Sequence, residues 1–446
     1  MTQISRLPKD TGPAGWNALL TEPPPASPLD GDITADWLVI GGGLAGLAAA
    51  RQLLKLRASD RVVLLEASRI GDGPAGRNSG FMIDLPHDLQ SEDYGGNAEK
   101  DQRQIAQNRA AIEFAAEAVE EFGIPAESFD RWGKVNGAAT ASGVKHNEQF
   151  AAHLASMNEP YEMFDQKAMK DLTGTDFYLS GLYTPGTVLL QPAMYVRGLA
   201  EGMRRNSGLV VHENSPVVSL DKLGKDWRAK TPKGSISTPR IILAVNGHAQ
   251  SFGFYEQRLM HVFTYASMTR ALTDDEIKRL SGAPKWGATP ADPMGTTVRR
   301  ISGTGGDRVL VRNRFTFDPS MEISEARTER VGRDHDKSFK ARFPMLDGVE
   351  MEHRWGGRLC LSLNGVSAFG QVDDGIYSAC CQNGLGTTKG TLSGMCAADL
   401  AAQGNSPFVA ELQSEDAPKK LPMAPIAQIG ATLTLRWKEW RAGKEL

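Results

Sequence analysis

The feature that most constrains the fold of this chain is an apolar run followed by a glycine turn, a second apolar run and an acid. Trp37–Ile40 is almost wholly apolar, which is typical of a parallel strand buried on both faces. Gly41, Gly43 and Gly46 follow with the spacing G-x-G-x-x-G, and Glu66 ends the next apolar run. This order of strand, turn, helix, strand and acid predicts an α/β unit with a dinucleotide site.

Each residue of the motif has a physical role in binding a dinucleotide. The first glycine permits a tight turn, the second admits a pyrophosphate, and the third lets the helix pack closely on the strand. The N-terminus of the helix directs N–H groups at the phosphates, and the acid accepts hydrogen bonds from ribose hydroxyls. The motif alone fits FAD or NAD. The expected cofactor contacts are Gly41, Gly43, Leu44, Ala45, Gly46, Glu66 and Ala67.

A small-residue loop directly after the acid favours FAD over NAD. Residues 70–80 are rich in glycine, so their backbone can run beside a large cofactor. Arg77 offers a fixed fork of donors and Asn78 an amide. A glycine-rich surface loop is the alternative interpretation. The residues of this loop expected at the cofactor are Gly73, Gly76, Arg77, Asn78 and Ser79.

These motifs resemble those of the D-amino-acid oxidase superfamily of FAD-dependent amine oxidoreductases. Leu65-Glu66-Ala67, Ile70-Gly71-Asp72-Gly73 and Gly76-Arg77-Asn78-Ser79-Gly80 are most similar to the branch that contains gamma-glutamylputrescine oxidase and L-pipecolate oxidase. Residues 211–218, 241–247 and 383–390 also resemble cofactor-side segments of that superfamily. The resemblance spans about residues 15 to 405. It adds Val217, Asn246, Gly247, Asn383, Gly384, Gly386, Thr387 and Thr388 to the expected FAD contacts.

The resemblance implies an α/β fold with a discontinuous Rossmann-like FAD-binding domain and a mixed-sheet substrate domain. We expect the FAD domain in residues 35–95, 185–250 and 355–405, and the substrate domain in residues 96–184 and 251–354. Residues 1–34 are rich in proline and glycine and read as an extended lead-in along the surface. Residues 406–446 form a tail in which residues 429–440 suit an amphipathic helix or a strand.

Hydrophobic periodicity adds the main local elements. Helices are expected over residues 97–122, 146–157, 191–205 and 389–402, and a charged helix over residues 323–343. Strands are expected over residues 209–218, 227–229, 240–244, 262–269 and 308–317. Residues 323–343 alternate in charge, which indicates a solvated helix face rather than a ligand site.

The family resemblance implies oxidation of a carbon–nitrogen bond in an amine or amino-acid-type substrate. The imine that forms is then hydrolysed, and electrons pass to oxygen, giving peroxide, or to another acceptor. FAD carries the redox chemistry, and non-covalent binding is expected although Cys360 lies near a position that links flavin in some relatives. Two alternatives stay open, which are an FAD-binding subunit of a heteromeric amine dehydrogenase and an NAD-dependent dehydrogenase.

Candidates for the catalytic and substrate-binding residues are weaker than those for the cofactor. His261 and Tyr265 lie on a predicted strand of the substrate domain, and each also suits a structural role. Lys389 follows the late glycine-rich turn, where many amino-acid-type relatives carry a lysine slightly earlier. Because Thr388 takes that place here, an amine or gamma-glutamyl-type amine fits better than a simple N-methyl amino acid. Phe81, Met82 and Asn364 are expected to line the substrate pocket.

Composition limits the remaining classes of function. The 446 residues carry a formal net charge of −3, which argues against a nucleic-acid partner. No run approaches the roughly 20 apolar residues of a membrane span, and with no signal-peptide pattern the cytoplasm is the default location. The four cysteines lack metal-site spacing, so we expect no metal site and reduced, buried thiols. The sequence carries no signal for the oligomeric state.

Overall fold

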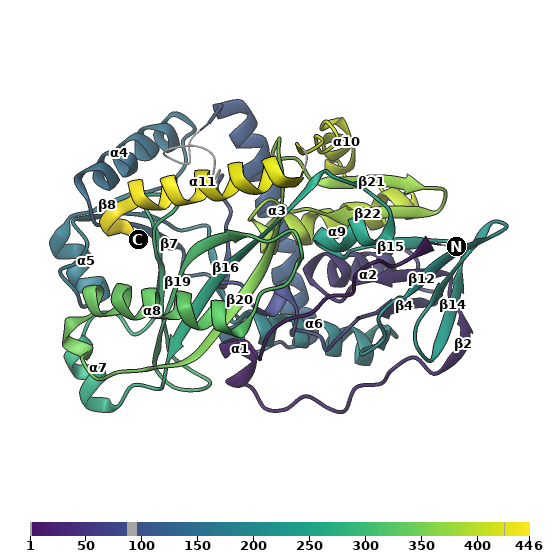
Figure 1. Ribbon diagram of the computed structural model, residues 1–446, viewed down its shortest axis with the longest axis horizontal. Coiled ribbons are helices and arrows are strands. Elements are labelled where there is room, and N and C mark those ends of the chain that lie inside the picture. The colour runs from purple at the N-terminus through teal and green to yellow at the C-terminus, as the bar shows by residue number, and fades with distance from the viewer. Residues whose placement is uncertain (1, 87–95, 423) are drawn as a thin grey trace.

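The computed structural model describes residues 2–86, 96–422 and 424–446. Figure 1 shows two sheet regions side by side along the long axis, with the segment before α1 and the last helix crossing between them. Residues 87–95, which end the first predicted FAD-domain segment, lie outside the described residues. Among the described residues, no helix is both long enough and apolar enough to cross a membrane.

The first region is built on a six-stranded sheet that contains the dinucleotide-type motif. Its neighbouring strands are parallel except for the last pair, β22 and β21. All residues of β3 and β4 are buried, as expected for strands covered on both faces. The strand order is β11 (Val210–His212), β4 (Val62–Leu65), β3 (Trp37–Ile40), β15 (Ile241–Leu243), β22 (Ile376–Cys380) and β21 (Ala368–Asp373).

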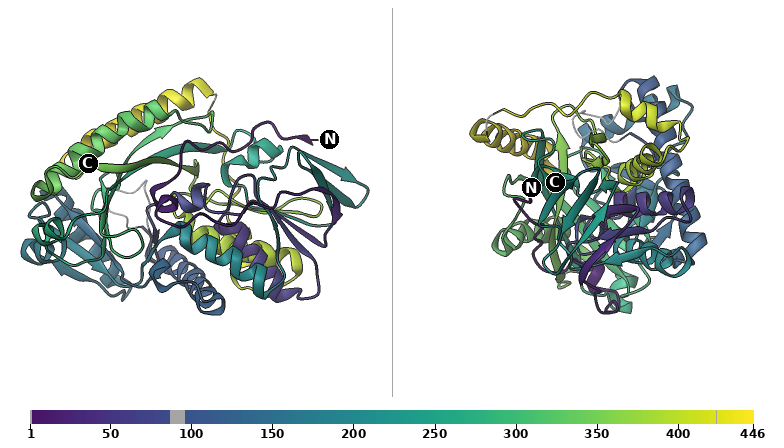
Figure 2. Two further views of the ribbon diagram at one scale, coloured as in Figure 1. Left: turned by 90° about the horizontal axis from the view of Figure 1, so that it is seen from below. Right: turned by 90° about the vertical axis from the view of Figure 1, so that its right-hand side faces the viewer.

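Alternate residues of these strands face two different layers. Trp37 and Val39 pack with four helices, whereas Leu38 and Ile40 pack toward a second, smaller sheet. Figure 2 shows the helices gathered on one side. These helices are α2 (Leu44–Leu56), α3 (Ala98–Phe122), α6 (Pro192–Asn206) and α9 (Gly386–Ala402). The smaller sheet has the order β1 (Thr2–Gln3), β12 (Ser219–Leu223), β13 (Asp226–Lys230), β14 (Gly234–Thr238) and β2 (Gly31–Thr34).

The second region is an eight-stranded sheet. Helix α8 (Glu325–Arg342) packs on its long strands, and α11 (Ala424–Ala442) crosses β19. The order is β20 (Met351–Ser362), β16 (Leu259–Thr269), β19 (Arg308–Phe317), β18 (Thr297–Ile301), β17 (Trp286–Pro290), β7 (Lys134–Ala138), β9 (Ser180–Thr184) and β8 (Glu162–Phe164). A three-stranded sheet has the order β5 (Phe81–Met82), β10 (Val188–Leu190) and β6 (Phe129–Asp130).

Short helices complete the structure around these sheets. The α-helices are α1 (Gly15–Ala18), α4 (Ala141–Ser156), α5 (Gln166–Thr173), α7 (Asp274–Leu280) and α10 (Phe408–Ser414). The 3-10 helices are η1 (Pro74–Gly76), η2 (Ala126–Ser128), η3 (Asn246–Phe252), η4 (Pro344–Leu346) and η5 (Gly443–Glu445).

The N-terminal lead-in is largely exposed, as expected, but part of it is buried. Trp16 in α1 is almost fully buried, and its indole N–H donates to the Asn78 carbonyl at 2.8 Å. Residues 2–3 and 31–34 are strands of the smaller sheet. Composition alone suggested an exposed segment because its prolines and glycines lack a periodic pattern. Contacts with distant parts of the chain nevertheless bury residues 14–17 and Leu29.

Most predicted elements are confirmed, with shifted ends. Helix α3 matches the expected range almost residue for residue. Residues 429–440, for which a helix or a strand was expected, lie in helix α11. The strand expected over residues 209–218 stops at His212, because Asn214 has φ 51° and the chain turns there. The proposed division into FAD and substrate domains stays a prediction, although strands from residues 37–65, 210–243 and 368–380 do form one sheet.

Candidate cofactor and substrate site

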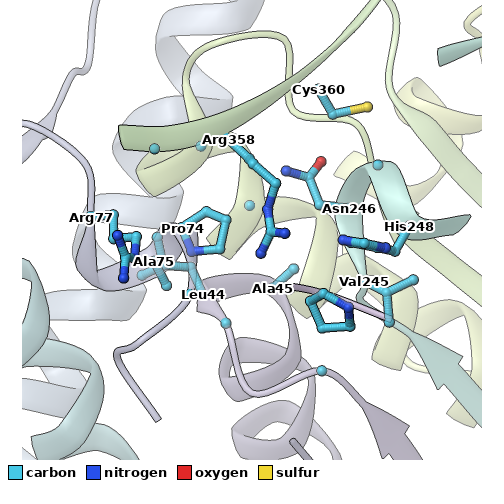
Figure 3. A pocket seen from close by; sticks show the side chains of 18 of the residues that line it. Leu44, Ala45, Pro74, Ala75, Arg77, Val245, Asn246, His248, Arg358 and Cys360 are labelled. Atoms are coloured by element: carbon cyan, nitrogen blue, oxygen red, sulfur yellow. The ribbon is translucent and has the colours of Figure 1, made fainter. Parts of the chain in front are cut away.

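A cavity lies where the ends of the parallel strands meet the eight-stranded sheet. Its walls come from the segments after β3, β4 and β15, from the start of α9, and from strands β16–β20. Ligands of open α/β sheets bind at this carboxyl edge of the strands. Figure 3 shows Pro74, Ala75 and Arg77 on one side of the cavity, and Asn246 and His248 on the other.

The three glycines of the motif have different tasks. Gly41 has φ 107°, which favours glycine. A Cβ on Gly46 would lie 1.8 Å from the Gly41 carbonyl oxygen, so helix α2 can approach the turn only with glycine there. Gly43 lines the cavity, and a Cβ on it would meet only Ala75, at 3.8 Å. Gly46 therefore shapes the turn, whereas Gly43 leaves room for a ligand.

Two helices present uncapped N-termini to the cavity. No described side chain caps α2 or α9, whereas α3 to α8 each have a side chain that accepts an N-terminal N–H bond. Gly43 and Leu44 of one helix and Gly386 and Thr387 of the other line the cavity. Free N–H groups with the positive end of the helix dipole form a site for an anion or a polar oxygen.

Glu66 stands beside the glycine turn, as its position after β4 predicts. Its Oε2 accepts from the Gly42 N–H at 2.7 Å, and its Oε1 accepts from the Ser68 N–H at 2.9 Å. Burial is the main cause that raises the pKa of this carboxyl, and the two backbone bonds work against it. The Ser68 hydroxyl also donates to Oε1 at 3.2 Å, so Oε2 is the oxygen that keeps a lone pair for a ribose hydroxyl. Ala67 also lines the cavity.

The loop over residues 70–80 is held by the side chains that the sequence singled out. Arg77 Nε donates to the Asp72 carbonyl at 2.6 Å, and its Nη atoms donate to carbonyls of Thr11, Gly12 and Gly356. Asn78 bonds Ala75 and Gly80 within the loop. Arg77 thus ties this loop to the lead-in and to β20. The arginine, Asn78, Ser79 and Gly73 line the cavity, and their contact with FAD stays a prediction.

The predicted residues from later segments gather at the same cavity. Asn246 has φ 50° and its Oδ1 accepts from the Cys381 N–H at 3.1 Å. Asn383 has φ 49° and its side chain bonds Val366 and Ser362 at 2.8 Å each. The late-segment cavity residues are Val217, Asn246, Gly247, Asn383, Gly384, Gly386 and Thr387.

Other predicted residues do not line the cavity. Strand alternation explains Met82 and Tyr265, because Phe81, Ile83 and Thr264 face the cavity and their neighbours face away. Met82 lies in the hydrophobic core, and the Tyr265 hydroxyl bonds Thr316 at 2.7 Å. Met82, expected in the substrate pocket, and Tyr265, a catalytic candidate, therefore do not line this cavity.

The other predicted residues that do not line the cavity lie in a helix or close a turn. Thr388 donates to the Ile83 carbonyl at 3.0 Å, and neither it nor Lys389 lines the cavity. Asn364 lies in the turn between β20 and β21 and bonds Ala417 and Lys419. Gly76 closes its turn, because a Cβ there would lie 2.0 Å from the Gly71 oxygen. The predicted residues that do not line the cavity can therefore affect a ligand only indirectly. Besides Met82 and Tyr265, they are Gly46, Gly76, Thr388, Lys389 and Asn364.

His261 lies at the cavity as predicted, beside a histidine that the sequence analysis missed. Gln250 Nε2 donates to His261 Nε2 at 2.8 Å, and burial lowers the pKa of His261 to about 4. His248 also lines the cavity, and burial lowers its pKa to about 3. Neither ring nitrogen of His248 makes a hydrogen bond of normal geometry within the described chain, although the Arg6 backbone lies beside the ring. A polar group of a bound ligand would satisfy it.

Arg358 on β20 is a second residue without a sequence signal. Figure 3 shows its side chain extending into the cavity toward Leu44 and Ala45 at the start of α2. Its Nη2 bonds the Asp10 carboxylate of the lead-in at 2.7 Å. A buried cation opposite a helix N-terminus makes this part of the cavity electropositive. Only the pairing of β20 with the rest of the large sheet brings Arg358 here.

The buried histidines predict acid-sensitive stability. Because the folded pKa of His261 lies below the ordinary 6.5, the unfolded chain binds more protons as pH falls from about 6.5 toward 4. Stability is therefore present above pH 6.5 and lost below it, by about 1–2 kcal/mol from this group at pH 5. Between pH 7 and pH 5, urea unfolding should show a smaller loss of unfolding free energy for His261→Gln than for the wild type. Equal losses of unfolding free energy in the two proteins would contradict the lowered pKa of His261.

The described residues contain no group of three or more histidine, cysteine or acidic side chains placed to hold a metal ion. All four cysteines are buried and free, which confirms the expected reduced thiols. Cys360 lines the cavity, and hydrogen bonding to Cys381 and burial raise its pKa well above the usual range. A thiol with a raised pKa is a poor nucleophile.

Comparison with known proteins connects this cavity to one family. The family model described as "DAO: FAD dependent oxidoreductase" matches residues 36–400. A gamma-glutamylputrescine oxidoreductase of Escherichia coli is 26% identical over 386 residues, covering 84% of this chain and 85% of that protein. A probable oxidoreductase of Haemophilus influenzae is 25% identical over 380 residues and covers 82% of each chain.

Solved structures give the same fold. Glycine oxidase from Geobacillus kaustophilus superposes with a TM-score of 0.69 at 17% identity, over 87% of this chain and 99% of that one. L-proline dehydrogenase from P. horikoshii superposes with a TM-score of 0.66, also at 17% identity, over 86% and 96% of the two chains. At this identity the likeness concerns the fold. It confirms an α/β fold of this type.

Proposed function

Because the chain belongs to the DAO family of FAD-dependent oxidoreductases, we propose that it oxidises a carbon–nitrogen bond of an amine or amino-acid-type substrate. The cofactor of this family is FAD, which would supply a two-electron oxidant that accepts a hydride from the carbon next to nitrogen. The imine product reacts with water to give a carbonyl compound and a released amine or ammonia. The relatives named for glycine, L-proline and gamma-glutamylputrescine support this substrate class.

The residues of the cavity fit FAD. The open space at Gly43 and the uncapped start of α2 suit a diphosphate, with Arg358 facing them. Glu66 suits the ribose. His248 and the uncapped start of α9 suit polar edges of the flavin ring. We propose non-covalent binding, because the raised pKa of Cys360 disfavours a thiolate at the cavity.

The side of the cavity formed by the large sheet suits a substrate amine. Thr264, Thr289 and Thr297 line it, from three different strands. The Thr289 hydroxyl donates to Asn136 Oδ1 at 2.7 Å, and Lys134 donates to the same oxygen. These two donors fix the orientation of the amide. The Thr289 oxygen therefore offers only lone pairs to the cavity, which makes it an acceptor for a substrate N–H.

This acceptor is the observation that carries the proposed substrate class. Hydride transfer from carbon requires an unprotonated amine, whose nitrogen lone pair stabilises the developing cation. Such a nitrogen keeps at least one N–H when the amine is primary or secondary, and that N–H can donate to Thr289. Arg312 also lines this part of the cavity and adds positive charge near it. An amine that carries a carboxylate or amide group elsewhere suits a site with an acceptor at Thr289 and a cation at Arg312.

The first test is spectroscopic and uses the intact protein. Purified protein should be yellow, or become yellow with added FAD, and substrate should bleach the flavin absorption without oxygen. The panel comprises glycine, L-proline, putrescine and gamma-glutamylputrescine. Repeating the assay in air with peroxide detection separates an oxidase from a dehydrogenase. Colourless protein that takes up no FAD would contradict the proposal, whereas bound FAD that no amine bleaches would favour the non-catalytic subunit.

Thr289→Val is expected to lower kcat/KM for the best amine of that panel by about tenfold or more. Valine keeps the shape of threonine and removes the acceptor. Thr289→Ser keeps the hydroxyl and should stay within about threefold of the wild type. Steady-state kinetics and the flavin content of each variant measure the effect. Equal loss in both variants, or none in the valine variant, would show that this hydroxyl does not meet the substrate.

A further inference from the structure

Helix α11 carries a row of exposed apolar side chains. Leu433, Trp437 and Trp440 are 65%, 53% and 78% exposed. Their spacing of four and then three residues places them on one face of the helix. Figure 2 shows α11 standing out from the body in the view along the long axis. Large aromatic side chains this exposed are unusual on a soluble surface and indicate contact with something else.

The opposite face of α11 holds the helix to the protein. Leu435 and Ala442 pack in a hydrophobic cluster with Val262 and Phe315 of the large sheet. Glu439 accepts from Arg314 at 3.0 Å, from the Phe315 N–H at 3.1 Å and from the outward-lying Arg436 at 2.9 Å. The exposed row is thus not the packing face of a helix left undocked. It is the second apolar face of a helix that is already anchored.

Charge is divided between the two faces as well. The acids of the helix and of the adjoining η5 are Glu439 and Glu445, and each is only 2% exposed. The cations Arg436, Arg441 and Lys444 are exposed. Arg441 lies over the Trp437 ring at 5.2 Å. The exposed side of α11 is therefore basic, although the whole chain has a formal net charge of −3.

We propose that this α11 outer face, made of Leu433, Arg436, Trp437, Trp440 and Arg441, docks on the surface of an anionic lipid bilayer. A helix with an aromatic row flanked by cations lies in the plane of the interface, where indole rings sit at the headgroup level. Cations beside the row are attracted to anionic headgroups. The helix would lie on the membrane and not cross it.

Charge complementarity favours lipid over the other occupants. A second copy of the chain meeting the first through this face would bring Arg436 and Arg441 of both copies together, and like charges oppose that contact. A nucleic acid would match the cations, but the continuous row of leucine and indole rings matches an acyl–headgroup boundary better. Both remain outcomes of the experiment below.

The experiment uses the full chain, with FAD added, and extruded vesicles. Vesicles of equal parts phosphatidylglycerol and phosphatidylcholine should sediment the protein and shift its tryptophan emission to the blue. Phosphatidylcholine alone should bind at least tenfold more weakly, and 0.5 M NaCl should weaken binding to the anionic vesicles at least fivefold. Trp437→Ser combined with Trp440→Ser should reduce binding at least tenfold.

Two further variants test the contribution of the cations and the specificity for the apolar row of α11. Arg436→Gln with Arg441→Gln should weaken binding and flatten its dependence on salt. Leu223→Ser changes another exposed apolar residue, 42% exposed at the end of β12, and should bind as the wild type does. Thermal unfolding and flavin content confirm that each variant is folded.

Any one of the following results would overturn the proposal. The first is binding that does not distinguish the two vesicle types, and the second is full binding by the tryptophan double variant. The third is light scattering that shows a dimer lost in the double variant, or capture of a single-stranded RNA oligonucleotide in place of vesicles. None of these readouts depends on catalytic turnover, so failure here is distinct from failure of the proposed oxidoreductase activity.

Discussion

Gly46→Ala is expected to give a protein that is strongly destabilised and holds no flavin. The alanine Cβ would lie 1.8 Å from the Gly41 carbonyl oxygen and 3.3 Å from the Val39 side chain. The obstacle is backbone, so α2 or the turn itself must move. Because the same turn forms the start of α2 at the cavity, the loss of packing is also a loss of the cofactor site. A destabilisation on the order of 4 kcal/mol belongs to this class of change.

The matched control is Gly43→Ala, three residues earlier in the same motif. A Cβ there meets only Ala75 at 3.8 Å, so the protein should fold with nearly wild-type stability. The methyl group would nevertheless occupy the cavity wall where a pyrophosphate is expected, and FAD affinity should fall at least tenfold. Urea unfolding and flavin titration separate the two effects. Wild-type stability of Gly46→Ala would contradict the packing role of the third glycine.

Lys134→Met is expected to stabilise the protein at neutral pH. Lys134 is fully buried on β7, and burial lowers its pKa from 10.5 to about 8, while Asp84 partly opposes the shift. Arg109 pairs with Asp84 at 3.1 Å and reduces its effect on the lysine. A depression of this size corresponds to about 3 kcal/mol. Losing one hydrogen bond to Asn136 offsets about 1 kcal/mol of that gain.

The pH dependence gives the sign of this effect. The folded pKa lies below the unfolded one, so between about pH 8 and 10.5 the unfolded chain binds more protons than the folded chain. The lysine therefore destabilises the fold below pH 8, and this penalty disappears as pH rises to 10.5. The variant should be more stable than the wild type at pH 7, and the gap should close across that range.

Urea unfolding of both proteins at pH 7, 8.5 and 10 measures the gap. The difference between the two proteins matters, because buried tyrosines such as Tyr195, whose pKa burial raises, change stability in the alkaline range of both. Lys134→Arg is the matched control, since it keeps the charge buried and should give no gain at pH 7. Two results would contradict the lowered pKa of Lys134. One is a Lys134→Met variant less stable than the wild type at pH 7, and the other is a stability difference between the two proteins that does not change with pH.

Local signals in the sequence predicted several of the residues that line the cavity. Gly41, Gly43 and Glu66 could be placed because each answers to a requirement of its own few neighbours, namely a turn, a close approach or the end of a strand. Helix α3 was predicted closely for a similar reason. Its apolar period, its Asn97 cap and Gly123 at its end are all written within the segment.

The substrate side was predicted less well, because side-chain direction there depends on pairing between distant strands. Tyr265 and Met82 have suitable chemistry but face away, whereas their neighbours Thr264 and Phe81 face the cavity. A shift of one residue in strand register reverses every side chain. The bulge between Thr264 and Tyr265 makes such a shift invisible to periodicity.

The sequence by itself determined that this chain binds a dinucleotide, through the spacing of its glycines and the acid after β4, because backbone dihedral limits and close approach are local demands. The resemblance of several such segments added the FAD-dependent family. Only the tertiary structure decided that Arg358, His248 and Thr289 share the cavity, and that the lead-in reaches it. It also decided which face of α11 stays exposed, because burial is a property of the packed chain and not of any single segment.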